Sequence, residues 1–159
     1  MRRSHWLLLV TAALAFYGVG TIWLVQLSAY PLWAYVGRDH FSGYHLAWWH
    51  TVWGVIFLPA GVKFIASIFM IWLRPPEIPR WSAVLGVALE VVAFVLTAVY
   101  WGPLQANLAT PDGLSLPLFH ELLFTHWLRV ALFTAYAVLL FWMLARVLAG
   151  GLERRRLHD

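Results

Sequence analysis

The residues of this sequence best suited to chemistry are histidines that stand next to aromatic residues where long apolar stretches begin. His45 and His50 open one such stretch in the segment YHLAWWH, and His126 and Arg129 open another in the segment THWLR. An imidazole can bind a transition metal or exchange a proton near neutral pH. These histidines are therefore the first candidates for a functional site.

The spacing of the histidines argues against a metal site built on one helix. His45 and His50 are five residues apart, which separates them by about 140° around a straight helix, and Glu121 and His126 have the same spacing. A metal would instead take ligands from several helices. We expect His50 and His126, with Glu90 or Tyr100 as a third ligand. Imidazole with carboxylate suits iron, copper, zinc or manganese, and a chain without cysteine is a poor copper(I) site.

Two alternatives to a metal site stay open. A haem could be held between the imidazoles of His50 and His126, with Arg129 beside a propionate. The same histidines could also serve without any cofactor as anchors at the membrane interface. No Ser or Asp lies at a depth that would make a hydrolase triad with them, and phosphate-binding loops and nucleic-acid surfaces are absent from the sequence.

The composition identifies the solvent of this chain as lipid. Of its 159 residues 62% are hydrophobic and only 11% are charged, too few to cover a soluble domain of this size. We predict an all-α integral membrane four-helix bundle, a single transmembrane domain with spans at about 6–28, 46–73, 81–101 and 122–146. Residues 30–45 and 102–117 are expected to connect the spans at one side, with Pro31 breaking or kinking the first span and Gly102-Pro103 ending the third.

The arginines predict the orientation of the bundle. Apart from Arg38 and Arg129, they lie near the termini or in the turn at 74–80, and all of these positions fall on one side of the membrane. Short cytoplasmic loops are enriched in Lys and Arg, so we expect both termini to be cytoplasmic in a bacterial-type inner membrane. The lipid bilayer is the expected surrounding, no nucleic-acid partner is expected, and small residues in the first span would allow a homodimer.

A second level of polar residues is predicted near the middle of the membrane. Lys63 and Glu90 each lie roughly 14 to 15 Å from the cytoplasmic ends of their helices at 1.5 Å per residue. A single charge at that depth is costly, so a partner is expected. The simplest arrangement pairs Lys63 with Glu90, and the other leaves Glu90 neutral and bound to Tyr17 or Thr97.

Helical spacing predicts which residues share a face and can act together. His126, Arg129, Phe133 and Tyr136 share one stripe of the fourth span, and Glu90, Thr97 and Trp101 share a stripe of the third. On the second span, the face that holds His50, Trp53, Gly54, Phe57 and Gly61 is expected to look inward, with His45 turned elsewhere. Pairing of Lys63 then requires Pro59 to bend the helix.

Several short motifs resemble the anthrone-oxygenase-like family of small four-span membrane proteins. They are Tyr30-Pro-Leu-Trp33, Tyr44-His45, Trp49-His50, Trp101-Gly-Pro-Leu-Gln105 and Thr125-His126-Trp127-Leu128-Arg129. The resemblance covers all four spans. It implies a hydrophobic, aromatic or quinone-like substrate that is oxidised at the membrane.

Three functions follow as hypotheses. The first is a membrane-embedded redox protein that binds or acts on a hydrophobic small molecule. In it His50 and His126 bind a metal or act as acid and base near Tyr100, Arg129 holds oxyanion charge, and Glu90 relays protons. The second is a non-enzymatic transporter or interaction subunit, and the third is a bis-histidine haem protein.

Overall fold

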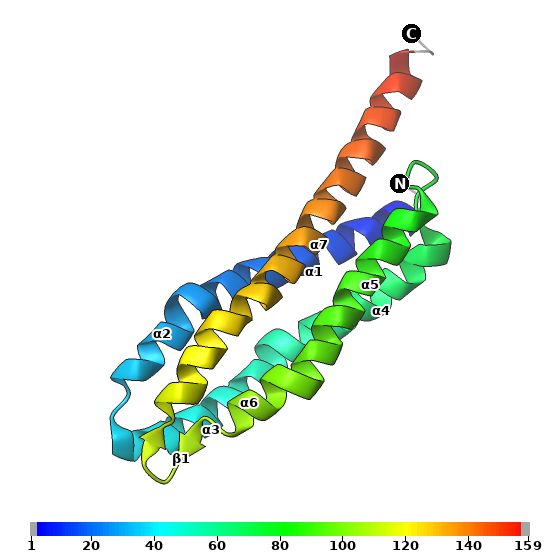
Figure 1. Cartoon of the computed structure of the whole chain (residues 1–159). Coiled ribbons are helices and arrows are strands. Elements are labelled where there is room, and N and C mark those ends of the chain that lie inside the picture. The colour runs from blue at the N-terminus through cyan, green and yellow to red at the C-terminus, as the bar shows by residue number, and fades with distance from the viewer. Residues whose placement is uncertain (1–2, 157–159) are drawn as a thin grey trace.

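Four long helical segments run antiparallel to one another and form the bundle (Figure 1). The structure is a computed structural model, and it describes residues 3–156. Each segment is long and apolar enough to cross a membrane, namely Arg3–Tyr35, Arg38–Leu73, Arg80–Ala106 and Leu116–Gly151. The prediction of an all-helical fold with four membrane-spanning helices is thus confirmed for length and composition.

The first two segments are each interrupted by a π-helical turn. The first consists of α1 (Arg3–Leu24), the π turn η1 (Val25–Ala29), α2 (Tyr30–Leu32) and the 3₁₀ turn η2 (Trp33–Tyr35). The second consists of the 3₁₀ turn η3 (Arg38–His40), α3 (Phe41–Val52), the π turn η4 (Trp53–Phe57) and α4 (Leu58–Leu73).

The last two segments are joined by a short hairpin. The third segment consists of α5 (Arg80–Leu96), the π turn η5 (Thr97–Trp101) and α6 (Gly102–Ala106), and the fourth is the long helix α7 (Leu116–Arg156). Between them, β1 (Ala109–Thr110) pairs antiparallel with β2 (Gly113–Leu114). We call the end of the bundle with these strands the hairpin end, and the opposite end, with the turn between α4 and α5, the turn end.

Each of the three π turns ends two residues before a proline, namely Pro31, Pro59 and Pro103. The residue that precedes the proline donates its backbone N–H to the carbonyl five residues earlier: Tyr30 to Val25, Leu58 to Trp53, and Gly102 to Thr97. A proline inside an α-helix lacks an N–H and its ring collides with the carbonyl four residues earlier. The widened turn relieves this collision and lets the helix continue.

These turns correct two predicted connections. Pro31 does not end the first segment, which stays helical to Tyr35, and Gly102-Pro103 does not end the third, which continues to Ala106. Most of the predicted connection at 30–45 is therefore helix. The predicted connection at 102–117 shortens to the hairpin and its flanks, because the π turns absorb prolines that would otherwise terminate the helices.

The four segments pack in a ring in which α1 and α5 each contact both α4 and α7. Two groups of buried residues form the core. One lies toward the turn end and includes Leu8, Ala15, Met70 and Leu140, and the other lies toward the hairpin end and includes Trp33 and Trp101. The aromatic core at the hairpin end surrounds the π turns, and the site described below lies beside it.

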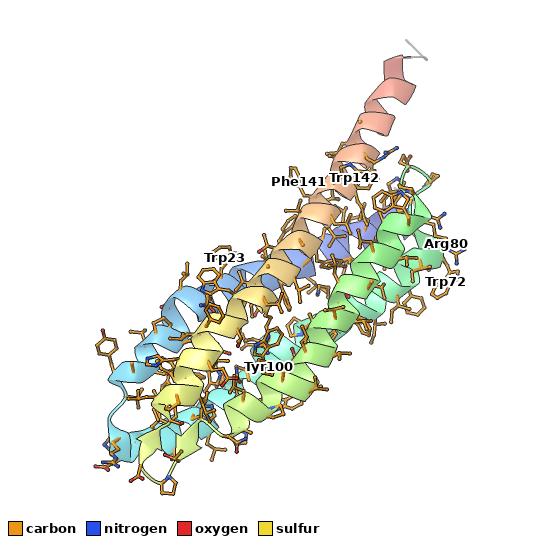
Figure 2. The ribbon with its side chains drawn as sticks, viewed as in Figure 1. Trp23, Trp72, Arg80, Tyr100, Phe141 and Trp142 are labelled. Atoms are coloured by element: carbon orange, nitrogen blue, oxygen red, sulfur yellow. The ribbon has the colours of Figure 1, made fainter. Side chains whose placement is uncertain are left out.

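The outer surface of the bundle is apolar and carries tryptophans. Trp72 and Trp142 lie toward the turn end, together with Arg80 (Figure 2), and Trp72 is 63% exposed. Amphipathic aromatic rings and cationic side chains are typical of the boundary between lipid headgroups and hydrocarbon. The surface is thus consistent with the predicted membrane environment.

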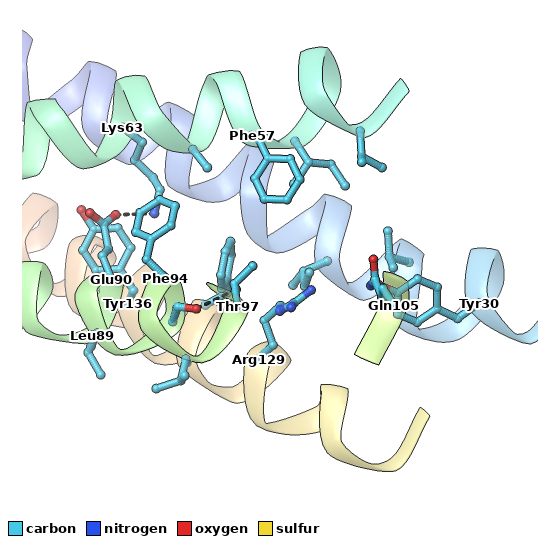
Figure 3. A pocket seen from close by; sticks show the side chains of 18 of the residues that line it. Tyr30, Phe57, Lys63, Leu89, Glu90, Phe94, Thr97, Gln105, Arg129 and Tyr136 are labelled. Atoms are coloured by element: carbon cyan, nitrogen blue, oxygen red, sulfur yellow. Dashed lines mark hydrogen bonds and ion pairs between the residues drawn. The ribbon is translucent and has the colours of Figure 1, made fainter. Parts of the chain in front are cut away.

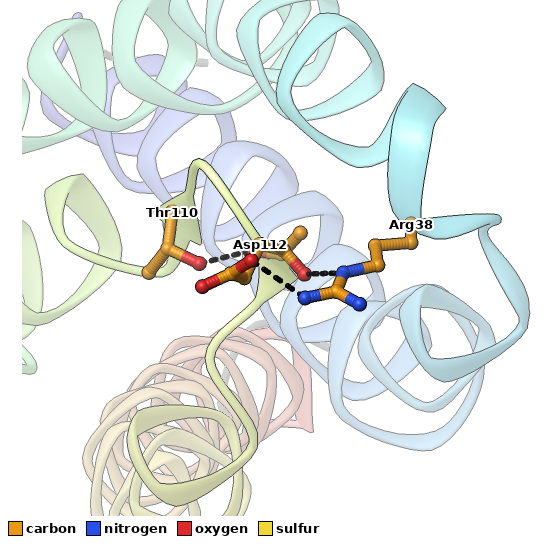
Figure 4. A network of polar contacts seen from close by, with 4 residues as sticks. Arg38, Thr110 and Asp112 are labelled. Atoms are coloured by element: carbon orange, nitrogen blue, oxygen red, sulfur yellow. Dashed lines mark hydrogen bonds and ion pairs between the residues drawn. The ribbon is translucent and has the colours of Figure 1, made fainter.

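An ion pair ties the hairpin to the start of the second segment (Figure 4). Arg38 donates from Nε to the carbonyl oxygen of Asp112 and from Nη2 to its carboxylate, each at 2.6 Å. Thr110 donates to the carbonyl of Gly113, and Gly113 has a φ of 93°, which favours glycine. This network closes the hairpin end of the bundle.

Candidate intramembrane binding site

A cavity lies inside the bundle, and all four segments contribute to its walls (Figure 3). It has about 60 Å³ of room for water-sized molecules, enough for several waters at roughly 10 to 15 Å³ each. Most of its walls are apolar, and the π turns supply Val25, Ile56, Phe57 and Thr97. π turns inside helices are frequent at functional sites.

The polar residues of the cavity form two groups at its two ends. One group comprises Lys63, Glu90 and Tyr136, and the other comprises Tyr30, Gln105 and Arg129 (Figure 3). Arg129 and Tyr136 both lie on α7, seven residues apart, which corresponds to roughly 10 Å along the helix axis. The cavity is therefore an apolar chamber with a polar group at each end.

The first polar group is built around an ion pair. The Lys63 ammonium donates a hydrogen bond to the Glu90 carboxylate, and each residue is only 4% exposed. The predicted pairing is confirmed, and the alternative in which Tyr17 or Thr97 binds Glu90 is wrong. Tyr17 donates instead to the carbonyl of Val55, and Thr97 to that of Ala93.

Two hydroxyls complete this first group. Ser67 Oγ lies 2.9 Å from the Lys63 carbonyl, to which it can donate, and 2.5 Å from Tyr136 Oη, where either hydroxyl can be the donor. The Lys63 ammonium also lies 4.5 Å from the centre of the Tyr136 ring. The two hydroxyls flank the Glu90 carboxylate as well. This network holds the ion pair in one geometry against the cavity wall.

The second polar group is built around Arg129, which is 9% exposed. Its guanidinium carbon lies 4.3 Å from the centre of the Trp101 ring, and the group interacts with the Tyr30 hydroxyl. Gln105 donates a hydrogen bond to the same hydroxyl. The guanidinium is thus held between an aromatic face and a phenol, and its Nε has no hydrogen-bond partner within the described residues.

His126 lies behind this second group and is completely buried. Its Nδ1 is 2.6 Å from Gln26 Oε1, and Gln26 Nε2 donates to the carbonyl of Leu123 at 3.1 Å. Since the amide oxygen accepts, Nδ1 carries the proton. Nε2 then carries the free lone pair of the ring, and this atom has no hydrogen-bond partner within the part of the chain that the structure describes.

The predicted faces of the third and fourth segments are confirmed. Glu90 and Trp101 are buried on the third, and His126, Arg129 and Tyr136 on the fourth. Tyr100 lies outside the cavity, where it is 36% exposed and donates to the Glu121 carboxylate at 2.6 Å. The predicted role of Tyr100 is therefore not supported by its position.

The predicted inward face of the second segment is wrong for His50, Trp53 and Gly54, which are exposed, whereas Phe57 of the same predicted face does line the cavity. His45, expected to be turned elsewhere, is buried against Trp33 and Phe41. The π turn η4 adds a residue to one turn, which rotates α3 against α4 by about 100° relative to a straight helix. Packing of Phe41, His45 and Val52 decides which face of α3 lies inside.

The predicted metal ligands are not brought together. His50 is exposed, His126 is buried beside Gln26, and Glu90 pairs with Lys63. Among the side chains that the structure describes, those of residues 3–151, no group of three or more His, Asp or Glu is placed to hold a metal ion. A haem between His50 and His126 has the same difficulty, because the two imidazoles face different surroundings.

The sequence prediction missed several residues of the site, namely Tyr30, Gln105, Ser67 and the partner role of Gln26. Gln26 and Gln105 are 4% and 6% exposed. An amide inside an apolar span is costly unless it is bound, which is the signal that could have identified both.

Comparison with known proteins finds no matching family model, curated protein or solved structure.

Proposed function

We propose that this chain is a membrane protein that binds, and acts as an oxidoreductase on, a hydrophobic aromatic or quinone-like small molecule inside its bundle. The observation that carries the proposal is the apolar cavity with convergent donors at one end. Small-molecule sites are typically concave and apolar, with a few placed polar groups that orient the ligand.

The residues of the cavity have distinct roles in this proposal. Apolar side chains from all four segments, including Val25, Val52 and Phe94, would surround the body of the ligand. Arg129 and Tyr30 would hold its oxygen and stabilise negative charge that develops there. Glu90, with Lys63, would exchange protons at the other end of the cavity.

The membrane setting orients the site. We place both termini in the cytoplasm of a bacterial-type inner membrane, because Arg3, Arg74, Arg80 and Arg146 belong to the turn end of the helices. The Arg129 end of the cavity then lies toward the outer leaflet, and the Lys63–Glu90 pair lies near the middle of the membrane.

The resemblance to the anthrone-oxygenase-like family is consistent with this proposal. Oxidation of an anthrone by O₂ converts a ring CH₂ to a carbonyl and releases one water. A base that removes the ring proton and a cation that holds the resulting oxyanion would both be needed. The cavity offers Glu90 and Arg129 for these tasks.

A second candidate is a non-enzymatic transporter, and a second cavity favours it. This cavity lies between α1 and α4 and is lined by Tyr17, Gly18 and Thr21. It shares Lys63, Ile22 and Ala60 with the first cavity. Lys63 therefore lies between the two cavities, which is the position expected for a residue on a transport pathway through the bundle.

Ligand-dependent stability tests the proposal. Protein in neutral-lipid nanodiscs is heated with menadione, anthraquinone or anthrone, and we expect at least one compound to raise Tm in proportion to its concentration. Ala60→Phe fills both cavities and should abolish the rise. Val62→Phe adds the same ring at a position 48% exposed, and should retain it.

Activity separates the two candidates. Oxygen consumption or a change in the ligand's absorption that is lost in Ala60→Phe but kept in Val62→Phe supports an oxidoreductase. Binding without turnover, together with ligand uptake into proteoliposomes, supports the transporter. If none of the compounds changes Tm, the proposed ligand class is wrong.

A further inference from the structure

The charges inside the bundle do not balance. Three side chains of charged type, Lys63, Glu90 and Arg129, are at least nine-tenths buried and line the cavity. Lys63 and Glu90 neutralise each other. Within the described part of the chain, neither ion pair, Arg38–Asp112 nor Lys63–Glu90, includes Arg129. The cavity therefore keeps one net positive charge.

The partners of Arg129 are neutral. Its guanidinium contacts the Trp101 ring and the Tyr30 hydroxyl, and its Nε has no hydrogen-bond partner among the residues that the structure describes. A guanidinium stays protonated in proteins. An intramembrane charge without a counter-charge is costly and marks a functional site by default. A ligand that brings one negative charge would remove this cost.

The phenol of Tyr30 is also arranged for an acceptor. Its oxygen receives a hydrogen bond from Gln105 and faces the Arg129 guanidinium, which is a donor only. Both acceptor positions of a phenol oxygen are then in use, and its own proton is left to donate. The Tyr30 O–H and the Arg129 Nε–H thus both require an acceptor at the same end of the cavity.

We infer that the ligand of this cavity is a hydrophobic monoanion whose charged oxygen, a carboxylate or a phenolate, binds Arg129 and Tyr30. This inference rests on the proposed binding function and adds the charge of the ligand. A single negative charge matches the single uncompensated guanidinium. The apolar walls exclude a large hydrated anion and favour a ligand whose remainder is hydrocarbon.

Pairs of probes that differ only in charge test the inference. Wild-type protein in phosphatidylcholine nanodiscs is titrated with anthracene-9-carboxylate and 9-anthracenemethanol, and with dodecanoate and dodecanol, by fluorescence and by Tm. We expect each carboxylate to bind at least tenfold more tightly than its alcohol. The aromatic and the alkyl pair show whether the cavity prefers an aromatic or an alkyl body on the charged ligand.

Matched arginine variants locate the effect. Arg129→Gln should reduce the carboxylate preference to about one, and Arg129→Lys should keep part of it. Arg146→Gln removes the same charge elsewhere on α7, where Arg146 lies over Trp142 outside the cavity, and should keep the full preference. If Arg129→Gln does not fold, the carboxylate preference of the wild type and the loss of that preference in Tyr30→Phe still test the inference.

The outcomes separate the two proposals. Equal binding of carboxylate and alcohol overturns the inference and leaves the proposed binding function intact. Failure of all four probes overturns the inference, and the proposed binding function fails with it only if menadione, anthraquinone and anthrone also leave Tm unchanged. Stabilisation of the wild type by chloride in place of gluconate, without a carboxylate preference, also overturns the inference, because a small inorganic anion would then be the counter-charge.

Discussion

Nδ1 of His126 on α7 lies 2.6 Å from Oε1 of Gln26 in the π turn of the first segment. This contact joins two residues a hundred positions apart and fixes which imidazole nitrogen carries the proton. It also directs the free Nε2 of His126 away from Gln26, within the buried core. Five predictions rest on this contact and on others inside the bundle.

Replacement of Gln26 by Met should destabilise the bundle. The substitution keeps the length of the side chain but leaves the buried His126 Nδ1–H without an acceptor, at a cost of about 1 to 3 kcal/mol. Equilibrium unfolding in mixed dodecyl maltoside and SDS micelles measures this change. Leu27→Met, at a neighbouring position that is 61% exposed, is the control and should have little effect. Equal stability of the two variants would show that the contact contributes nothing.

The Lys63–Glu90 ion pair predicts strong coupling between its two residues. Either Lys63→Met or Glu90→Gln alone should cost about 3 to 5 kcal/mol, because it leaves an uncompensated buried charge or an unsatisfied group. The double variant should recover much of this loss. A double-mutant cycle on the same unfolding curves gives the coupling energy. Additive losses would contradict the pairing.

The hydroxyl of Tyr17 is predicted to satisfy a carbonyl that a proline leaves free. Tyr17 Oη donates at 2.8 Å to the carbonyl of Val55, four residues before Pro59. Tyr17→Phe should therefore cost about 0.5 to 1.5 kcal/mol. In a Pro59→Ala background the restored backbone N–H can serve that carbonyl, so the loss should shrink. A loss of the same size in both backgrounds would refute this relationship.

The two histidines of the second segment should differ in their sensitivity to substitution. His45 is buried against Trp33 and Phe41, and its replacement by Ala opens a space in the aromatic core, so we expect a loss of about 2 to 4 kcal/mol. His50→Ala changes an exposed side chain and should stay within about 0.5 kcal/mol of the wild type. The same unfolding assay compares the free energies of unfolding of the two variants. A larger loss in His50→Ala than in His45→Ala would contradict the orientation of α3.

The metal and haem hypotheses can be tested with His50→Ala and with a further variant, His126→Ala. Elemental analysis and the visible spectrum of the purified protein would show a bound metal or haem directly. If one is present, it should survive His50→Ala, because that side chain lies outside the core, and His126→Ala should be the variant that loses it. Loss in His50→Ala would instead restore the first metal hypothesis.

The amino-acid sequence alone was sufficient to predict four apolar helices, the residues that share one face of the third and of the fourth, and the partnership of Lys63 with Glu90. These properties follow from hydrophobic length, from the 3.6-residue period and from the cost of a lone charge in lipid, all of which are local or nearly local. Counting residues from the ends of the antiparallel helices was enough to place Lys63 and Glu90 at the same depth in the membrane.

Only the tertiary structure decided which face of α3 is buried and which groups meet at Arg129. A proline can kink a helix, end it or be absorbed by a π turn, and the choice depends on the packing of neighbouring segments. In a membrane, an exposed tryptophan or histidine can sit at the interface, so residue type does not reveal the inward face. Tyr30, Gln105 and Arg129 come from three segments, and only the packing of the bundle places them together.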